Sequence, residues 1–150
     1  MILQDINSTN DVRMLGWHHT SDFCKQKIAD GQMIHLLAET TNTCDQDCEY
    51  CYTVLQTLDI PHFRSKQLPG ELHWEERKQL IDDAVKLGAV TYDVVGAGEP
   101  LLDQFFFQQI EYASSKGLTP VVFTNGSILG DPQNENRALE FAHRLWDVGA

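Results

Sequence analysis

Basic residues are scarce in this chain, and long apolar runs are missing. Its 150 residues contain 11 lysines and arginines against 22 aspartates and glutamates, which gives a formal net charge of −11. Such an acidic balance disfavours nucleic acid or an anionic membrane as a partner, because both attract basic surfaces. No stretch approaches the ~18 consecutive apolar residues that a membrane-spanning helix needs. We therefore expect neither nucleic acid nor a membrane among the partners.

Several familiar signals are also absent. The first residues, 1–6, lack the basic and long apolar regions of a secretory signal, which predicts a cytoplasmic protein with reduced cysteines. The chain has no G-x-S-x-G, no G-x-x-x-x-G-K and no H-E-x-x-H segment. This removes the sequence evidence for a nucleophile elbow, a phosphate loop or a zinc-protease helix. A hydrophobic content of 42% and a length of 150 residues are ordinary for one globular domain.

Cysteine is rare but concentrated. Of 4 cysteines, Cys44, Cys48 and Cys51 form a C-x3-C-x2-C cluster. Thiolates held this close favour a metal site, and with distant Cys24 they make a poor disulfide framework. A structural zinc or an electron-transfer cluster usually takes four protein ligands, so three cysteines leave one coordination position open for chemistry.

Zinc is the alternative to an iron–sulfur cluster. It would need a fourth ligand such as His35 or His62. Zinc modules commonly pair two C-x2-C knuckles, and neither histidine stands at a regular ligand spacing. The spacing therefore favours iron–sulfur.

Apolar runs and amphipathic stripes alternate along the chain, which predicts a parallel α/β sheet built from three strand–helix units. The predicted strands are 33–38, 90–95 and 119–124, and the predicted helices are 74–87, 104–116 and 131–148, the last starting at Asp131-Pro132. The inward residues expected on the first two helices are Trp74, Leu80, Ile81, Ala84, Val85 and Leu87, then Phe105, Phe106, Ile110 and Ala113.

The flanking segments are less regular. Residues 1–33 are expected to form a lead-in with one short helix capped by Thr20 or Ser21, and 53–70 a loop. The chain stops where a fourth strand is expected, so we expect a truncated core with unpaired sheet edges.

Three polar or glycine-rich segments each follow a predicted strand. The cysteine cluster follows the first, Gly96-Ala97-Gly98-Glu99-Pro100 the second and Thr124-Asn125-Gly126 the third. The last two are each also explained as simple turns. Because ligands gather at the carboxyl ends of parallel strands, their coincidence predicts one site.

The cysteine spacing, with aromatic Tyr50 just before the last cysteine, resembles the cluster loop of the radical S-adenosylmethionine (radical SAM) enzymes. Residues 96–100 resemble the family's Gly-Gly-Glu-Pro motif, with Ala97 in place of a glycine. The resemblance implies the N-terminal half of a partial (β/α) TIM-like barrel, divided into a lead-in at 1–33 and a truncated core at 34–150.

The resemblance also implies the cofactors. We expect three irons of a [4Fe–4S] cluster to be bound by Cys44, Cys48 and Cys51. The fourth iron would be bound by the amino and carboxylate groups of S-adenosylmethionine. Tyr50 is expected near the adenine. The methionine end of S-adenosylmethionine is expected to lie near Gly96, Ala97 and Gly98. Glu99 is expected either to hold the turn or to contact the ammonium group of the cofactor. Thr124 and Asn125 are expected to lie beside the cofactor.

The implied activity is reductive cleavage of S-adenosylmethionine to a 5′-deoxyadenosyl radical, which abstracts hydrogen from a substrate. The N-terminal lead-in and the order of the strands most resemble the branch of the family that contains molybdenum-cofactor, quinone-cofactor and peptide-modifying maturases. An electron donor such as flavodoxin or ferredoxin and a small-molecule or peptide substrate are the expected partners. A non-catalytic zinc or iron–sulfur module and an inactive truncated product are the alternatives.

Overall fold

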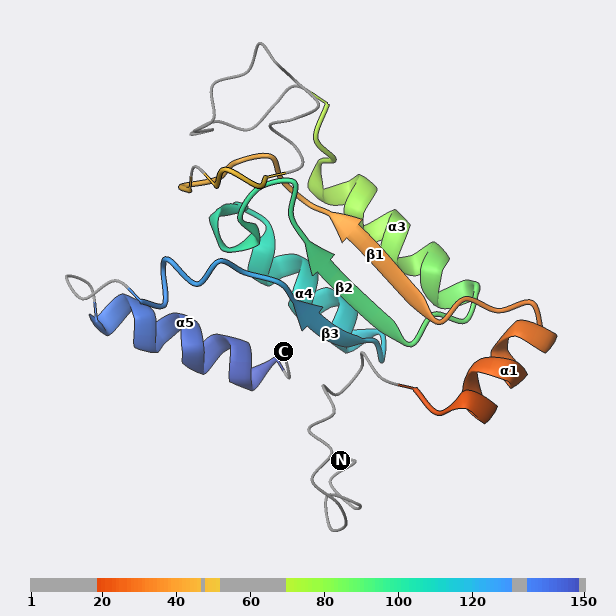
Figure 1. Cartoon of the computed structure of the whole chain (residues 1–150). Helices are drawn as coiled ribbons and strands as arrows, with labels where there is room; N and C mark the ends of the chain where they lie inside the picture. The colour runs from red at the N-terminus through yellow and green to blue at the C-terminus, as the bar shows by residue number, and fades with distance from the viewer. Residues whose placement is uncertain (1–18, 47, 52–69, 131–134, 149–150) are drawn as a thin grey trace.

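The structure is a computed structural model that describes residues 19–46, 48–51, 70–130 and 135–148 (Figure 1). The greater part of the expected lead-in, nearly all of the expected 53–70 loop and the Asp131-Pro132 helix start lie outside the described residues.

A three-stranded parallel sheet forms the centre, in the order β1-β2-β3. Its strands are β1 (His35–Glu39), β2 (Thr91–Val95) and β3 (Thr119–Val122). The register aligns Leu37 with Asp93 and Asp93 with Val121. Each strand falls within one predicted run or overruns it by a single residue, so the parallel α/β prediction is confirmed.

A helix follows each strand, as the alternation predicted, and one more helix precedes the first strand. The helices are α1 (Ser21–Ala29), α3 (Trp74–Lys86), α4 (Phe106–Ser115) and α5 (Glu135–Asp147), with an unexpected 3-10 turn, η1 (Pro100–Leu102). Thr20 caps α1, since its Oγ1 accepts a hydrogen bond from the Phe23 amide at 3.3 Å. Gly88 follows α3 with a φ of 90°, a left-handed conformation that favours glycine and ends the helix there.

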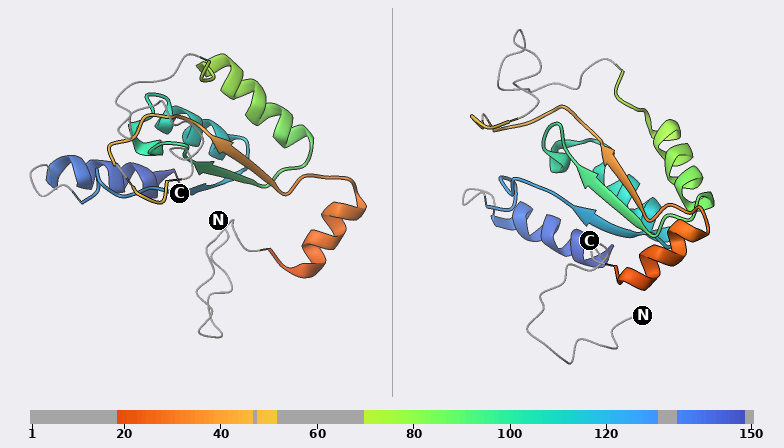
Figure 2. Two further views of the ribbon diagram at one scale, coloured as in Figure 1. Left: turned by 45° about the horizontal axis from the view of Figure 1, so that its top comes forward. Right: turned by 45° about the vertical axis from the view of Figure 1, so that its right-hand side comes forward.

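The core lies between the sheet and the α3–α4 layer, and α5 lies alongside α4 (Figure 2). Leu36 of β1 is 8% exposed, whereas its neighbour Leu37 is 56% exposed. Because side chains alternate across a strand, Leu37 faces away from α3 and α4. The largest apolar side chains that are fully buried are Tyr92, Phe106, Ile81, Ile110 and Val94.

The stripe expected on α3 is partly wrong. Leu80 and Leu87 are 37% and 55% exposed, and the buried face is Arg77, Ile81 and Ala84. On a helix of 3.6 residues per turn these three align, while the two leucines lie on the flank of the stripe. The buried face therefore centres on a charged residue that the expected apolar stripe did not include.

Candidate functional site

The carboxyl ends of the three strands bring three loops together. They are the cysteine loop (residues 40–51), the β2 loop (96–100) and the β3 loop (124–127). The Gly98 amide donates to the Thr41 carbonyl at 2.9 Å, and the Glu99 amide donates to the Thr43 carbonyl at 2.7 Å. The β2 loop is therefore hydrogen-bonded along the backbone that leads into the cysteines.

Glycines permit this approach. A Cβ at Gly98 would lie 2.1 Å from the Thr43 carbonyl oxygen, and one at Gly96 would lie 1.8 Å from the Gly98 oxygen. Neither distance is possible for real atoms, so both positions require glycine for backbone packing inside the protein. Ala97 carries its methyl group on the border of a separate cavity.

Glu99 is 2% exposed, and both oxygens of its carboxylate accept hydrogen bonds from within the protein. One oxygen accepts from the Leu101 amide at 2.9 Å and from the Thr124 hydroxyl at 2.6 Å, and the other accepts from the Asn125 amide at 2.7 Å. Of the two roles expected for Glu99, holding the turn is the one that the geometry displays. The residue also joins the β2 loop to the β3 loop.

Asp45 and Ser127 belong to this assembly, although sequence reasoning missed both. The Asn125 side-chain amide donates to Asp45 Oδ1 at 2.9 Å, and the Ser127 hydroxyl donates to Asp45 Oδ2. The Ser127 amide donates to Asn125 Oδ1 at 2.8 Å. The Asn-Gly pair signalled the turn, but nothing in the sequence distinguished Asp45 from its acidic neighbours.

Cys44, Cys48 and Cys51 are partly buried thiols on the cysteine loop, and none of them is in a disulfide. The Cys51 amide donates to the Cys48 carbonyl at 3.0 Å, which folds the chain back between these two residues. Burial raises the pKa of the Cys44 thiol, and the nearby carboxylates of Asp45 and Glu99 raise it further. Within the described ranges, no three His, Cys, Asp or Glu side chains converge as a ligand set.

The donor set nevertheless matches an iron–sulfur cluster in its chemistry, because three reduced thiols on one loop are the ligands such clusters take. His35 does not suit the zinc alternative. It is the first residue of β1, at the end of the strand away from the cysteine loop, and its Nδ1 lies 2.7 Å from Asp93 Oδ2. His62 lies outside the described residues.

Two hollows border the loops. One, of about 490 Å³, lies at the ends of β2 and β3 and is lined by Val95, Gly96, Gly98, Val122, Phe123 and Thr124. Three of these are residues predicted to contact the cofactor. Tyr50 on the cysteine loop is 86% exposed.

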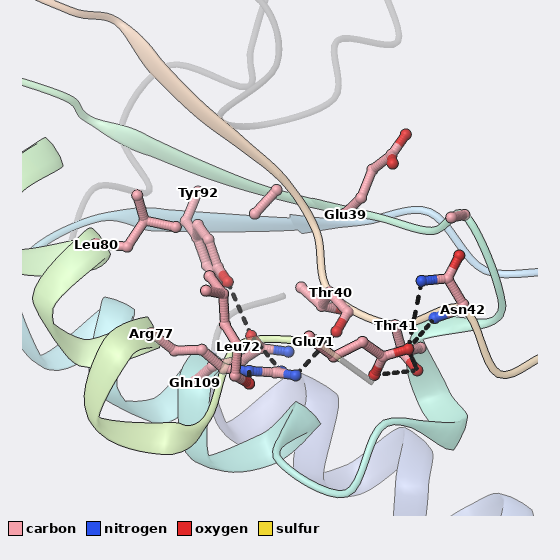
Figure 3. Close-up of a pocket in the computed structure, with 13 residues that line it drawn as sticks. Glu39, Thr40, Thr41, Asn42, Glu71, Leu72, Arg77, Leu80, Tyr92 and Gln109 are labelled. Carbon is pink, nitrogen blue, oxygen red and sulfur yellow. Dashed lines mark hydrogen bonds between the residues drawn. The ribbon is translucent and has the colours of Figure 1, made fainter. Parts of the chain in front are cut away.

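The other cavity, of about 270 Å³, lies beside the base of the cysteine loop (Figure 3). Its polar wall anchors that base: Arg77 Nη2 donates to the Thr40 carbonyl at 2.9 Å, and Glu71 accepts from the Asn42 amide at 2.7 Å. Arg77 also donates to Asp103 and, at 3.2 Å, to Gln109. The loop thus starts from a point fixed by α3 and its preceding segment.

Comparison with known proteins decides the family. The sequence profile of the radical SAM superfamily matches residues 38–149. The chain belongs to the radical SAM superfamily. This membership implies an iron–sulfur enzyme family that uses a [4Fe–4S] cluster and S-adenosylmethionine.

Among curated proteins, the radical SAM chain is 31% identical over 109 residues to an Fe-coproporphyrin III synthase of Methanosarcina barkeri (strain Fusaro / DSM 804), a match covering 73% of this chain and 23% of the relative. It is 30% identical over 117 residues to an AdoMet-dependent heme synthase of Oleidesulfovibrio alaskensis (strain ATCC BAA-1058 / DSM 17464 / G20), covering 77% and 28%. The chain thus spans about a quarter of these relatives.

Among solved structures, BtrN in complex with AdoMet and 2-DOIA shares the fold at a TM-score of 0.54 and 20% identity, over 79% of this chain and 43% of BtrN. This likeness is consistent with the expected partial barrel. In the part of the chain that the structure describes, no helix has the length and apolar character needed to cross a membrane.

Proposed function

We propose that this chain is the cluster-binding and S-adenosylmethionine-binding part of a radical SAM enzyme, with Cys44, Cys48 and Cys51 as the iron ligands. The observation that carries the proposal is their position. Three thiols, none of them in a disulfide, share one loop, which is hydrogen-bonded to both neighbouring loops at the carboxyl edge of a family-matched sheet. When bound, the cluster and S-adenosylmethionine supply a 5′-deoxyadenosyl radical that removes hydrogen from a substrate.

The chain's own residues bind and orient the cofactor in this proposal. The exposed Tyr50 ring offers a flat surface on which the adenine can stack. Gly96, Gly98 and Thr124 line the hollow at the ends of β2 and β3, where the methionine end would lie, with Ala97 in the same loop. Glu99 and Asn125 hold the walls of that hollow in place through their mutual hydrogen bond.

We further propose that residues 34–150 form the core, that 1–33 are a lead-in, and that a flavodoxin or ferredoxin supplies the electron. The substrate would be a small molecule or a peptide. The names of the two curated relatives favour an iron porphyrin, or a precursor of one, as the first small molecule to test.

Anaerobic reconstitution with iron and sulfide tests the proposal. We expect a brown protein with about four irons and four sulfides per chain, as a cubane cluster requires. Adding S-adenosylmethionine should change the electron paramagnetic resonance spectrum of the reduced protein, because the cofactor occupies the open iron. A colourless protein that takes up zinc and no iron would instead support the non-catalytic zinc module.

A further inference from the structure

The side chain of Asp45 joins two loops that are far apart in the sequence. Its two carboxylate oxygens accept from Asn125 Nδ2 and Ser127 Oγ, 80 and 82 residues away. We name these three residues the Asp45 clasp. Hydrogen bonds to an ionised carboxylate are roughly twice as strong as neutral ones, so the clasp is a firm link for a partly exposed loop.

The clasp closes a ring of hydrogen bonds. Asn125 connects to Glu99 through its backbone amide, and Glu99 connects back to Thr43 of the cysteine loop through its own amide. The links therefore run from Asp45 to the β3 loop, from there to the β2 loop, and back to the cysteine loop at Thr43. The backbone from Thr43 to Asp45 completes the ring. A closed ring restrains a loop more than a single contact, because each link limits the freedom of the next.

From this geometry we infer that Asp45 is a positioning residue for the cluster, an inference that rests on the proposed function. Asp45 directly follows Cys44, so fixing its side chain fixes the backbone from which the Cys44 thiol projects. Ligand side chains that are already ordered lose less conformational entropy when they bind. The clasp therefore holds part of the ligand set near its binding conformation before iron arrives.

The ring also gives Asn125 a role beyond the one expected from the sequence. Its side-chain amide donates to Asp45 and its side-chain carbonyl accepts from Ser127, so both ends of the side chain are used in the clasp. In the proposed site, Asn125 therefore acts on the cofactor through the loops that it joins as well as by its position beside the hollow.

Asp45→Asn tests the inference, with Glu49→Gln as the matched control. Both changes remove one negative charge from the same loop and keep the side-chain volume, but Glu49 is exposed and lies outside the clasp. Ser127→Ala breaks the same link from the other side. Two readouts are needed: hydrogen exchange of the iron-free protein over residues 41–46 and 124–127, and iron release from the reconstituted protein to a chelator.

We expect Asp45→Asn and Ser127→Ala to exchange and to release iron about tenfold to a hundredfold faster than wild type, the effect of losing one charge-assisted hydrogen bond. Glu49→Gln should match wild type in both. If Asp45→Asn and wild type release iron at the same rate, the positioning role is wrong, whether or not the variant has a lower melting temperature. Equal effects of Asp45→Asn and Glu49→Gln would do the same by assigning the result to charge alone.

A failure of the proposed function and a failure of the positioning role alone give different results. If the wild-type protein takes up no iron, the proposed function fails and the positioning role fails with it. Exchange in the iron-free protein still decides whether the three loops form one hydrogen-bonded unit. If wild type takes up iron and the clasp variants hold it equally well, only the positioning role is wrong.

Discussion

Two residues of the β2 loop, Gly98 and Glu99, determine how closely the loops at the ends of the strands approach one another. At Gly98 the hydrogen in place of a Cβ lets two backbones come within hydrogen-bond distance, and at Glu99 one buried carboxylate accepts one hydrogen bond from η1 and two from the β3 loop. Both residues were expected beside the cofactor. Their contacts in the structure are with the protein itself, so the segment predicted to bind the cofactor also packs the loops together.

Gly98→Ala should destabilise the protein by about 1–3 kcal/mol, as overpacking typically does. The added Cβ would lie 2.1 Å from a backbone oxygen, which has no flexible side chain to move aside. Urea unfolding measures the loss. Gly130→Ala is the control, because its Cβ would meet the nearest atom at an ordinary 3.5 Å. Equal stability of the two variants would show that the β2 loop is not packed as described.

Replacing the cysteines separates the cluster ligands from the remaining thiol. We expect Cys44→Ala, Cys48→Ala and Cys51→Ala to lose most of the iron taken up on reconstitution, since each removes one soft ligand. Cys24→Ala should keep it, because Cys24 lies in α1, outside the cysteine loop. Iron and sulfide are counted per chain in each variant. Full iron content in Cys48→Ala would contradict the ligand assignment.

At the scale of elements, apolar periodicity predicted the three strands and the order of the helices, because burial of an apolar face is what it reports. It could not predict the buried pair of Arg77 and Asp103 or the η1 turn. A charged residue is assigned to solvent unless its partner is known, and here the partner lies 26 residues away. The positions of the candidate loops could be predicted because each loop follows the end of a predicted strand. The Asp45 clasp could not be predicted because it depends on contacts between residues far apart in the sequence.

Helices α3 and α4 are also joined by an ion pair that should respond to pH. The hydrogen bond from Lys116 Nζ, 2.7 Å from Asp82 Oδ1, lowers the pKa of Asp82 below its ordinary value of 3.8, and the Tyr112 hydroxyl lowers it further. A carboxyl with a lowered pKa in the folded state stabilises the protein above the unfolded pKa. This stabilisation disappears as pH falls through the folded pKa.

Asp82→Asn should therefore lose stability at pH 7 and show a flatter decline of the free energy of unfolding below pH 3.8. Part of the decline should persist, because Lys86 also lowers the pKa of Asp83. Chemical denaturation at a series of pH values gives the profile, and Glu140→Gln on α5 serves as the control. Identical profiles for wild type and Asp82→Asn would mean that solvent screens the pair completely.

At the scale of the whole molecule, the described sheet has its two outer strands, β1 and β3, each paired on one side. One face packs against α3 and α4, and the other carries Leu37 at 56% exposure. The BtrN likeness covers 43% of that chain, so the folds correspond over a part of a larger barrel. Exposed strand edges and apolar face residues together are the features through which separate chains associate.

We expect the 150-residue chain to self-associate as its concentration rises, and to turn over little S-adenosylmethionine by itself even when reconstituted. Leu37→Lys should reduce the association, because it places a charge on the sheet face turned away from α3 and α4. Leu87→Lys is the matched control: Leu87 is 55% exposed but lies at the end of α3. Sedimentation velocity over a range of concentrations measures both. A single monomeric species at every concentration, together with multiple-turnover cleavage, would contradict this prediction, and equal effects of the two lysines would exclude the sheet face as the contact.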